Sequence, residues 1–144
     1  MSFTAQNRLL EDLWGNSSKK YVVPRFQREY SWSTDEVDSL WNDLFADEEF
    51  FLGSIVLNVG SDSERTEIID GQQRMLTMTI LYAAIRDVAH EMGLESNALI
   101  VNNSEIYRSG AFGGGHYIIH PADSLKDYFR RSVQQYPNPE FNSP

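Results

Sequence analysis

A short β-branched run that passes through one glycine directly into a long helix constrains this chain more than any other stretch. Ile68 and Ile69 form the run, Asp70-Gly71 forms the turn, and helical character begins at Gln72. Apolar residues recur over the helix at steps of three and four: Met78, Leu81, Ile85, Val88 and Met92. This spacing predicts an amphipathic helix that follows a strand without an intervening loop.

Such a junction is a ready anion site, because the first N–H groups of the helix lack partners and lie at the positive end of its dipole. Gly71 lets a backbone or a phosphate approach closely, and Arg74 brings a fork suited to phosphate oxygens into the first turn. Gln72 and Gln73 offer amide groups, and Asp70 offers a carboxylate for a metal ion or a water. First-turn polar residues often only cap a helix, so the spacing alone leaves both interpretations open.

Composition excludes several classes of protein. The chain has 144 residues, enough for one domain with its own core, and no cysteine, which excludes disulfides, thiol nucleophiles and cysteine-ligated metals. Its 12 Lys and Arg against 21 Asp and Glu give a net charge of −9, which argues against strong direct DNA binding by this domain. The N-terminus does not have the pattern of a signal peptide, and no apolar run is long enough for a membrane span. We therefore expect a cytoplasmic domain.

A second helix is predicted from Ser33, where Ser33 and Glu36 match a capping box, to about Phe45. Its apolar residues are expected to lie in the core: Val37, Leu40, Trp41, Leu44 and Phe45. Seven acidic residues fall within fifteen positions here: Asp35, Glu36, Asp38, Asp43, Asp47, Glu48 and Glu49. They are typical of a solvated helix face and its end rather than of a metal site.

The remaining elements follow from periodicity and turn residues. We expect helices at 4–14, 72–92 and 121–135, strands at 21–23, 51–59, 64–69, 99–101 and 116–120, and a glycine-rich loop at 102–115. His116 and His120 are four apart on one predicted strand, too far apart to share a metal easily. Three of the five prolines fall in the last eleven residues, which divides the chain into a domain at 1–133 and a linker or cut end at 134–144.

The stretch from Pro24 to Trp32 is the second unusual one, because it interleaves arginines and a glutamine with aromatic residues. That mixture suits a site where rings stack on a base and guanidinium groups neutralise phosphate. An irregular segment whose aromatics cover the core, with its arginines in solvent, can show the same mixture, and the stretch alone favours this second interpretation.

Four blocks in a fixed order carry a family resemblance. They are Val23-Pro24-x-Phe26-Gln27-Arg28-x-Tyr30-x-Trp32, Leu40-Trp41-x-Asp43, Phe51-Leu52-Gly53-Ser54-Ile55 and Ile69-Asp70-Gly71-Gln72-Gln73-Arg74. Together they resemble the N-terminal domain of GmrSD-type modification-dependent restriction proteins, which is grouped with the ParB/sulfiredoxin-like fold. The resemblance covers roughly residues 5–130.

The resemblance implies an α+β domain whose small mixed sheet is flanked by helices, and a Mg²⁺-dependent site that hydrolyses nucleoside triphosphates to control DNA restriction in phage defence. By position, the nucleotide-binding residues are Gln27, Arg28, Gly71 and Arg74, and the catalytic residues are Asp70, Gln72, Gln73, Arg74 and Arg28. The helix N-terminus and Arg74 would cradle phosphates, while Arg28 would neutralise the charge that develops in transfer. Asp70 would hold Mg²⁺ or orient the attacking water, and Gln72 or Gln73 would position that water.

The chain also departs from the family pattern. Family members usually run to several hundred residues and often carry a C-terminal HNH nuclease domain, so a downstream nuclease domain or subunit is an expected partner and pairing of the domain with itself is a further one. Met75-Leu76 stands where Leu-Thr is expected, which removes one hydroxyl near the turn. Two other functions stay open: a module that senses a nucleotide or a partner without turnover, and, less favoured because of the negative charge, a ParB-like nuclease.

Overall fold

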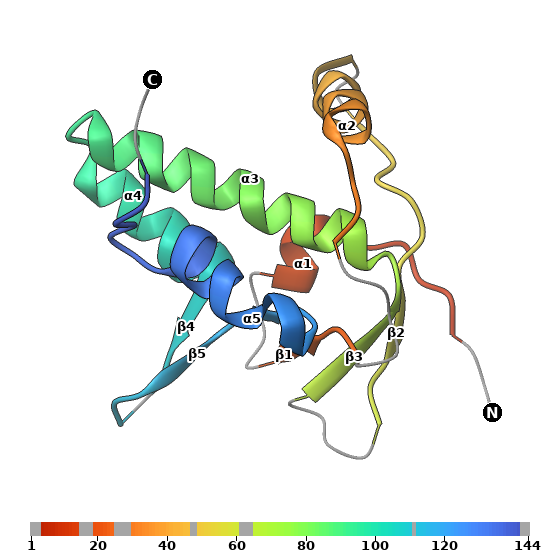
Figure 1. Ribbon diagram of the computed structural model, residues 1–144. Helices are drawn as coiled ribbons and strands as arrows, with labels where there is room; N and C mark the ends of the chain where they lie inside the picture. Colours follow the sequence, from red (N-terminus) through yellow and green to blue (C-terminus); the bar gives the residue numbers. More distant parts are fainter. Residues whose placement is uncertain are drawn as a thin grey trace.

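The computed structural model describes residues 4–14, 19–24, 30–46, 49–60, 65–110 and 112–141 (Figure 1). Within these ranges the helices are α1 (Leu10–Trp14), α2 (Thr34–Ala46), α3 (Gln72–Glu91), α4 (Glu95–Val101) and α5 (Asp123–Phe129). The strands are β1 (Lys20–Val22), β2 (Val56–Asn58), β3 (Arg65–Asp70), β4 (Tyr107–Ser109), β5 (Gly115–Tyr117) and β6 (Ile119–His120). Two π-helical turns, η1 (Asn102–Ile106) and η2 (Arg130–Gln134), extend α4 and α5. Among the described helices, none has the length and apolar character of a membrane span.

The main sheet is mixed and has the strand order β2-β3-β1-β6. Strand β3 pairs in parallel with β1 and in antiparallel with β2, and β1 pairs in parallel with β6. Strands β4 and β5 form a separate antiparallel hairpin. The architecture is therefore α+β with a small mixed sheet beside helices, which confirms the predicted fold class.

The core joins the sheet to the first turns of α3. Its buried members come from α1, from the sheet and its flanks, from α3 and from α5: Trp14, Tyr21, Val23, Ile68, Met75, Leu76, Ile118, Ile119 and Phe129. Burial of these side chains is the main contribution that holds β3 and α3 together. The β3–α3 turn is thus flanked by the buried core residues Ile68 and Met75.

In the second half of α3, a buried arginine connects the helix to the segments that pack against it. Arg86 is fully buried, its Nε lies 2.8 Å from Asp87 Oδ1, and its Nη1 donates to Asn102 Oδ1 at 3.0 Å. Its guanidinium also donates to the main-chain carbonyls of residues 133–135 at 2.7–3.2 Å. A buried charge is tolerated only when it is paired and hydrogen-bonded, and Arg86 meets that condition. The side of α3 that carries Arg86 therefore faces η1 and η2.

As a consequence, the predicted apolar stripe of α3 is only partly in the core. Met78 is buried, but Ile85, Val88 and Met92 are exposed. A surface helix normally turns its apolar stripe inward. The inward side of this half of α3 is occupied instead by Ala83 and Arg86.

Helix α2 also differs from its prediction. The helix itself is confirmed. Glu36 Oε2 accepts a hydrogen bond from the Ser33 N–H at 2.9 Å, which is the glutamate half of a capping box, and another from the Ser33 hydroxyl. Its apolar side is not core, however, because among the α2 residues only Leu40 is buried. The periodicity correctly predicted the helix, but the prediction that its apolar residues lie in the core is wrong except at Leu40.

Several predicted boundaries are corrected. Helix α1 begins at Leu10 and not at residue 4, and the predicted strand at 51–59 is reduced to β2, at 56–58. The predicted strand at 99–101 is wrong, because those residues form the end of α4, a helix that contacts α3 and η1 and in which Ala98 is buried. An apolar run of three residues does not distinguish a strand from a helix.

The predicted loop at 102–115 is wrong as well. It contains η1 and the β4–β5 hairpin, and a Cβ at Gly115 would lie 2.4 Å from the Arg108 carbonyl oxygen. The glycine is needed there for close approach of two backbones. The predicted strand at 116–120 is split at Ile118, since β5 belongs to the hairpin and β6 to the main sheet. The predicted helix at 121–135 is confirmed as α5 with η2.

The segment after residue 133 contacts α3. The Gln134 side chain is buried and donates to the Ile119 carbonyl at 2.8 Å, and Asn138 donates to Asp87 Oδ2 at 2.9 Å. Tyr136 lies over Arg86, with the guanidinium carbon 5.2 Å from the ring centroid. The division of the chain at residues 133 and 134 stays a prediction.

Candidate functional site

The predicted junction of strand, turn and helix is confirmed. Strand β3 ends at Asp70, α3 begins at Gln72, and Gly71 between them has φ +92° and ψ 12°, a left-handed conformation that favours glycine. The Gly71 N–H donates to Asp70 Oδ1 at 3.0 Å, while the first helical bond runs from the Met75 N–H to the Gly71 carbonyl at 3.1 Å. Asp70 is exposed at this junction.

The conformation at Gly71 shows whether a side chain caps the start of α3, which the sequence left open. It is the N-cap of α3 and offers no side chain, and no side-chain hydrogen bond caps the helix at this position. The Asp70 carboxylate bonds the turn itself and not the helix end. The arrangement is therefore that of a helix N-terminus without an N-cap side chain, which retains the capacity of the helix end to attract an anion.

The close approach at Gly71 is made by another part of the chain. A Cβ at Gly71 would lie 3.1 Å from Cγ1 of Ile55, the last residue of the block Phe51-Leu52-Gly53-Ser54-Ile55. Gly71 is buried under that side chain. Phosphate access to the turn is consequently restricted to the sides that Ile55 leaves open.

Gln73 ties the first block to α3. Its side chain is buried, and its Oε1 accepts hydrogen bonds from the main-chain N–H of Ser31 at 2.7 Å and of Trp32 at 3.3 Å. One helical turn later, Thr77 Oγ1 lies 2.9 Å from the Tyr30 hydroxyl and donates to the Gln73 carbonyl at 2.7 Å. The segment that follows Gln27-Arg28 is thus fixed on the first turns of α3.

Tyr30 packs against the core cluster, which confirms the core interpretation of this ring rather than base stacking. Gln27 and Arg28 lie outside the described residues. Their predicted place in the site stays a prediction, although the anchored residues that follow them lead to the same turn.

Arg74 ties the third block to α3. Its Nη1 donates to the carbonyls of Leu52 at 3.3 Å and of Ser54 at 3.0 Å. Gly53 lies directly over the guanidinium, because a Cβ at that position would be 2.0 Å from Nη1. The side chain predicted to cradle phosphates therefore also holds a loop, and it does so from a half-buried position.

Three of the four blocks meet at the β3–α3 turn, and one does not. The second block lies on α2, where Leu40 is buried while Trp41 and Asp43 are exposed. Gln72 is buried at the start of α3. The predicted residues that the structure describes are thus one exposed carboxylate, a buried glycine, two buried amides and a half-buried arginine.

A magnesium ion at Asp70 would depend on ligands beyond the described side chains. Within the described ranges, no three His, Asp or Glu side chains gather closely enough to hold a metal ion. Mg²⁺ is commonly held by one or two carboxylates together with substrate phosphates and water. The exposed Asp70, with one oxygen fixed by the turn, fits that mode of binding.

The histidines lie elsewhere. His116 is in the hairpin and His120 in the main sheet, and burial lowers the pKa of His120, assisted by the charges of Lys20 and Lys126. On the far end of α3, His90 Nδ1 lies 2.5 Å from Glu95 Oε2 and 3.2 Å from the Tyr136 hydroxyl. None of these contacts involves the β3–α3 turn.

Comparison with known families decides the relationship. The family described as GmrSD restriction endonuclease, N-terminal domain, matches residues 10–143. The chain belongs to this family. The match spans all four blocks of the GmrSD N-terminal domain and continues beyond residue 133 to the segment that contacts α3. No curated protein matches the chain.

Family membership places this GmrSD N-terminal domain in DNA restriction and phage defence, as part of a larger system with a partner or nuclease domain. The sequence indicates the turn but gives no sign of the partners in three contacts that organise it. They are Arg74 with Gly53, Gln73 with the main chain at 31–32, and Tyr30 with Thr77. Gly53, which interrupts the block between Leu52 and Ser54, is the sequence signal of a close approach there.

Proposed function

We propose that the β3–α3 turn of this GmrSD N-terminal domain binds a nucleoside triphosphate and hydrolyses it with Mg²⁺, and that this reaction regulates restriction. The observation that carries the proposal is the convergence of three blocks on one helix N-terminus. Residues 31–32 are held by Gln73, residues 52–54 are held by Arg74, and the exposed Asp70 stands at the end of β3. Such convergence on a turn is expected of a site, because packing alone does not require polar anchors from separate segments.

Binding of the phosphates would use the start of α3. The helix has 20 residues and begins at a glycine, so its dipole and its main-chain N–H groups favour negative charge at the turn. The Asp70 carboxylate would repel a phosphate placed beside it. A cation between the two removes that repulsion, which is the physical reason to propose Mg²⁺ with Asp70 as its protein ligand.

The contacts refine the roles within this proposal. Gln73 Oε1 accepts two main-chain N–H groups, so Gln73 would position the first block, and the amide of Gln72 or Gln73 would position the attacking water. Arg74 would neutralise phosphate charge from beneath the 52–54 loop, and Arg28 would approach from the first block. Mg²⁺, when bound, supplies charge neutralisation of the phosphate oxygens. The ParB/sulfiredoxin-like grouping belongs to the same proposal, and the mixed sheet is consistent with it.

A module that binds a nucleotide without turnover is the second candidate. It is favoured by one observation, that Arg74 and Gln73 both bond the main chain of neighbouring segments. Residues with such bonds could report nucleotide binding by moving the loops they hold. Turnover is what separates the two candidates.

The test measures binding and phosphate release with GTP, UTP, CTP and ATP in the presence of Mg²⁺. The variants are Asp70→Ala and Arg74→Ala, with Asp43→Ala and Arg131→Ala as matched controls at exposed positions outside the turn. Saturable release that is lost in the first pair and kept in the second supports hydrolysis at this site. Binding without release supports the sensing module, and no binding of any nucleotide would overturn the proposal.

A further inference from the structure

The chain between α2 and β2 depends on one side chain of α3 for its position. Nη1 of Arg74 donates to the Leu52 carbonyl at 3.3 Å and to the Ser54 carbonyl at 3.0 Å. Among the described residues, no other group makes a hydrogen bond to residues 51–54. We call residues 51–55 the 51–55 segment, and Figure 1 shows this part of the chain passing beside the first turn of α3.

The 51–55 segment lies against the turn at which the phosphates are proposed to bind. A Cβ at Gly71 would meet Ile55, the last residue of the segment, at 3.1 Å. The next residue, Val56, is in register with Asp70 at the end of β3. Helical side chains lean toward the N-terminus of their helix, so the Arg74 side chain also leans toward the turn. The guanidinium therefore lies beside both the segment and the start of α3.

The two edges of the Arg74 guanidinium differ in what they contact. An arginine carries its N–H donors on Nε, Nη1 and Nη2 in one rigid plane, and the Nε–Nη2 edge matches two phosphate oxygens. In Arg74, Nη1 makes both bonds to the segment, whereas Nε and Nη2 have no acceptor among the described residues. Neither of these two atoms is buried, so the Nε–Nη2 edge is open to a ligand. One guanidinium can thus hold the segment and bind an anion at the same time.

We propose that a phosphate group bound at the β3–α3 turn occupies the Nε–Nη2 edge of Arg74 and thereby orders the 51–55 segment. This inference rests on the proposed function and adds the regulation of that site. A guanidinium that phosphate fixes on one edge has already lost its side-chain freedom, so its bonds to Leu52 and Ser54 form at a smaller entropic cost. When the phosphate leaves, that freedom returns and the segment loses order. Phe51, which is 77% exposed, is the part of the surface that changes with the state of the site.

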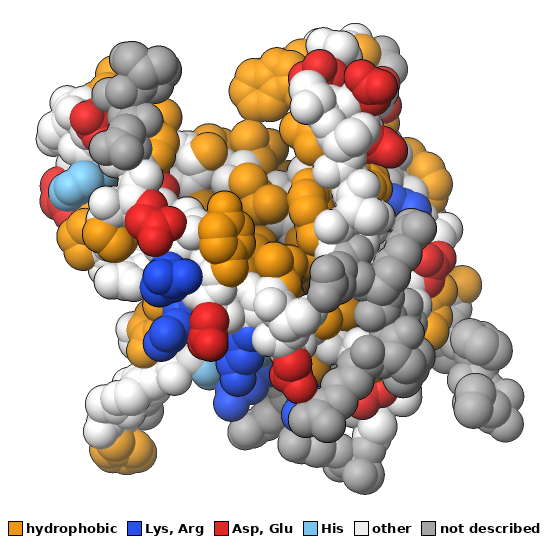
Figure 2. All heavy atoms as spheres, in the orientation of Figure 1, with side chains coloured by type: hydrophobic (Ala, Val, Ile, Leu, Met, Phe, Trp, Pro, Cys, Tyr) orange, Lys and Arg blue, Asp and Glu red, His pale blue; other side chains and the backbone are white. Residues whose placement is uncertain are grey.

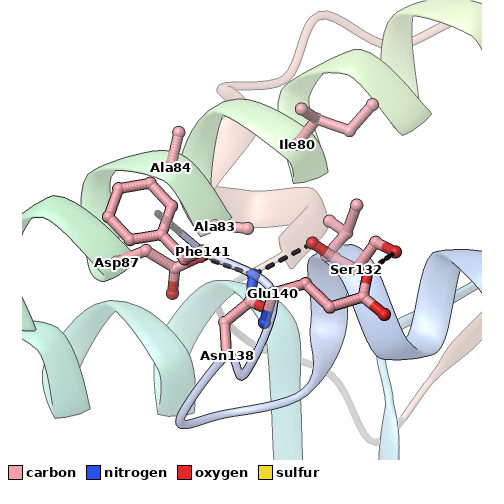
Figure 3. A pocket seen from close by; sticks show the side chains of 9 residues that line it. Ile80, Ala83, Ala84, Asp87, Ser132, Asn138, Glu140 and Phe141 are labelled. Carbon is pink, nitrogen blue, oxygen red and sulfur yellow. Dashed lines mark hydrogen bonds between the residues drawn. The ribbon is translucent and has the colours of Figure 1, made fainter. Parts of the chain in front are cut away.

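Two other parts of the molecule bear on where a phosphate binds. A cavity of about 250 Å³ lies between α3 and the C-terminal segment (Figure 3). Its described lining contains the carboxylates of Asp87 and Glu140 and no Lys or Arg, so it does not favour an anion. Figure 2 shows Lys and Arg side chains gathered over α5 and η2, where Lys126, Arg130 and Arg131 are exposed. These cations compete for an anion, and the experiment therefore needs a control there.

The probe is inorganic triphosphate with Mg²⁺, whose binding to the full chain is measured by isothermal titration calorimetry. Order in the 51–55 segment is measured as the rate of chymotrypsin cleavage after Phe50 and Phe51, identified by mass spectrometry, because cleavage requires local opening of the chain. Cleavage after Phe112, an exposed residue between β4 and β5, is the internal control.

Three variants accompany the wild-type chain. Arg74→Ala removes both edges of the guanidinium, whereas Arg74→Lys keeps the charge without the fork. The double variant Lys126→Ala/Arg131→Ala is the control for anion binding over α5 and η2. A circular dichroism melt confirms that each variant is folded.

The expected result is that saturating triphosphate slows cleavage after Phe50 and Phe51 at least about fivefold in the wild-type chain and leaves cleavage after Phe112 unchanged. The control Lys126→Ala/Arg131→Ala should show the same slowing. Arg74→Lys should bind triphosphate without any slowing, which separates the fork from the charge. The proposal is overturned if triphosphate does not bind, if it binds to the wild-type chain without slowing cleavage, or if Arg74→Lys is slowed as much as the wild type.

Phosphate release from nucleotides, measured in the same preparations, separates a failure of this inference from a failure of the proposed function. Release that Asp70→Ala abolishes, together with cleavage after Phe51 that nucleotides leave unchanged, overturns the inference and keeps the proposed function. Slower cleavage without release from any nucleotide supports the inference and removes hydrolysis from the site.

Discussion

Gly53 lies so close over the guanidinium of Arg74 that a single added carbon at position 53 would come within 2.0 Å of Nη1. The relationship joins two blocks that are about twenty residues apart in the chain, and Nη1 secures it with the carbonyls of Leu52 and Ser54. The loop and the first turn of α3 therefore form one structural unit.

Gly53→Ala tests that unit. The added Cβ displaces the Arg74 side chain, and φ +112° at this position strains any residue other than glycine. We expect a loss of about 1–3 kcal/mol in the free energy of unfolding, measured by urea denaturation, together with the nucleotide-binding defect of Arg74→Ala. Gly60→Ala is the control, since Gly60 also has a positive φ but no atom within 4 Å of the added carbon. Equal losses in the two variants would show that the contact with Arg74 contributes nothing.

Gln73→Ala removes the acceptor of two main-chain N–H groups. Gln73 is buried, but Ser31 is exposed and Trp32 half-buried, so water can replace the lost acceptor in part and the variant should lose about 1 kcal/mol in the free energy of unfolding. Hydrogen exchange at residues 31 and 32 should become faster, while exchange in β3 keeps its rate. Gln73→Glu retains an acceptor oxygen and should preserve slow exchange at both positions. Unaltered exchange in Gln73→Ala would contradict the assigned anchor.

Arg86→Met leaves Asp87 without its buried partner and the carbonyls of residues 133–135 without their donor. Breaking a buried ion pair on one side costs about 3–5 kcal/mol. We expect a loss of this size in thermal or urea unfolding, and faster proteolytic cleavage of the segment after residue 133. Arg131→Met, at an exposed position on η2, should change neither. Wild-type stability of Arg86→Met would show that α3 does not depend on the arginine.

Tyr136→Phe tests the acid side of the pH dependence. The hydrogen bond from the Tyr136 hydroxyl, followed by that from His90, lowers the pKa of Glu95 below 4.5. A lowered folded-state pKa stabilises the protein above the unfolded value, and that contribution is lost as the pH falls through the folded value. In Tyr136→Phe the pKa of Glu95 should rise toward 4.5, measured by carboxyl-carbon NMR titration. Tyr128→Phe, at an exposed tyrosine of α5, should leave it unchanged.

The sequence was most informative where structure is local. The β-branched run before Asp70, the glycine and the helix that follows were all correctly predicted, because a positive φ at Gly71 and the helical spacing after it are properties of the residues themselves. The capping pair Ser33 and Glu36 was correct for the same reason. The family match agrees with the resemblance that these blocks gave.

Predictions of burial from the sequence were wrong where burial depends on what a residue packs against in the fold. The apolar spacing of α2 and α3 predicts two amphipathic helices, but it does not tell whether the apolar side of each helix is buried or exposed. Arg86 would be placed in solvent by its type alone, and only the fold supplies the acceptors that allow its burial. Within the candidate site, the distant partners of Gln73 and Arg74 likewise belong to tertiary structure.

The contacts of the Arg86 guanidinium also limit how far the chain can be shortened from its C-terminal side without loss of stability. A fragment that stops at residue 133 would delete the carbonyls of residues 134 and 135 and the Gln134 amide that reaches Ile119. Arg86 would then remain buried on α3 without two of its hydrogen-bond acceptors, and water would have to enter to hydrate the guanidinium. Proteins engineered from this domain, whether as fusions or as minimal fragments, should keep the chain at least to Asn138. The side-chain amide of Asn138 donates to Asp87, the buried ion-pair partner of Arg86.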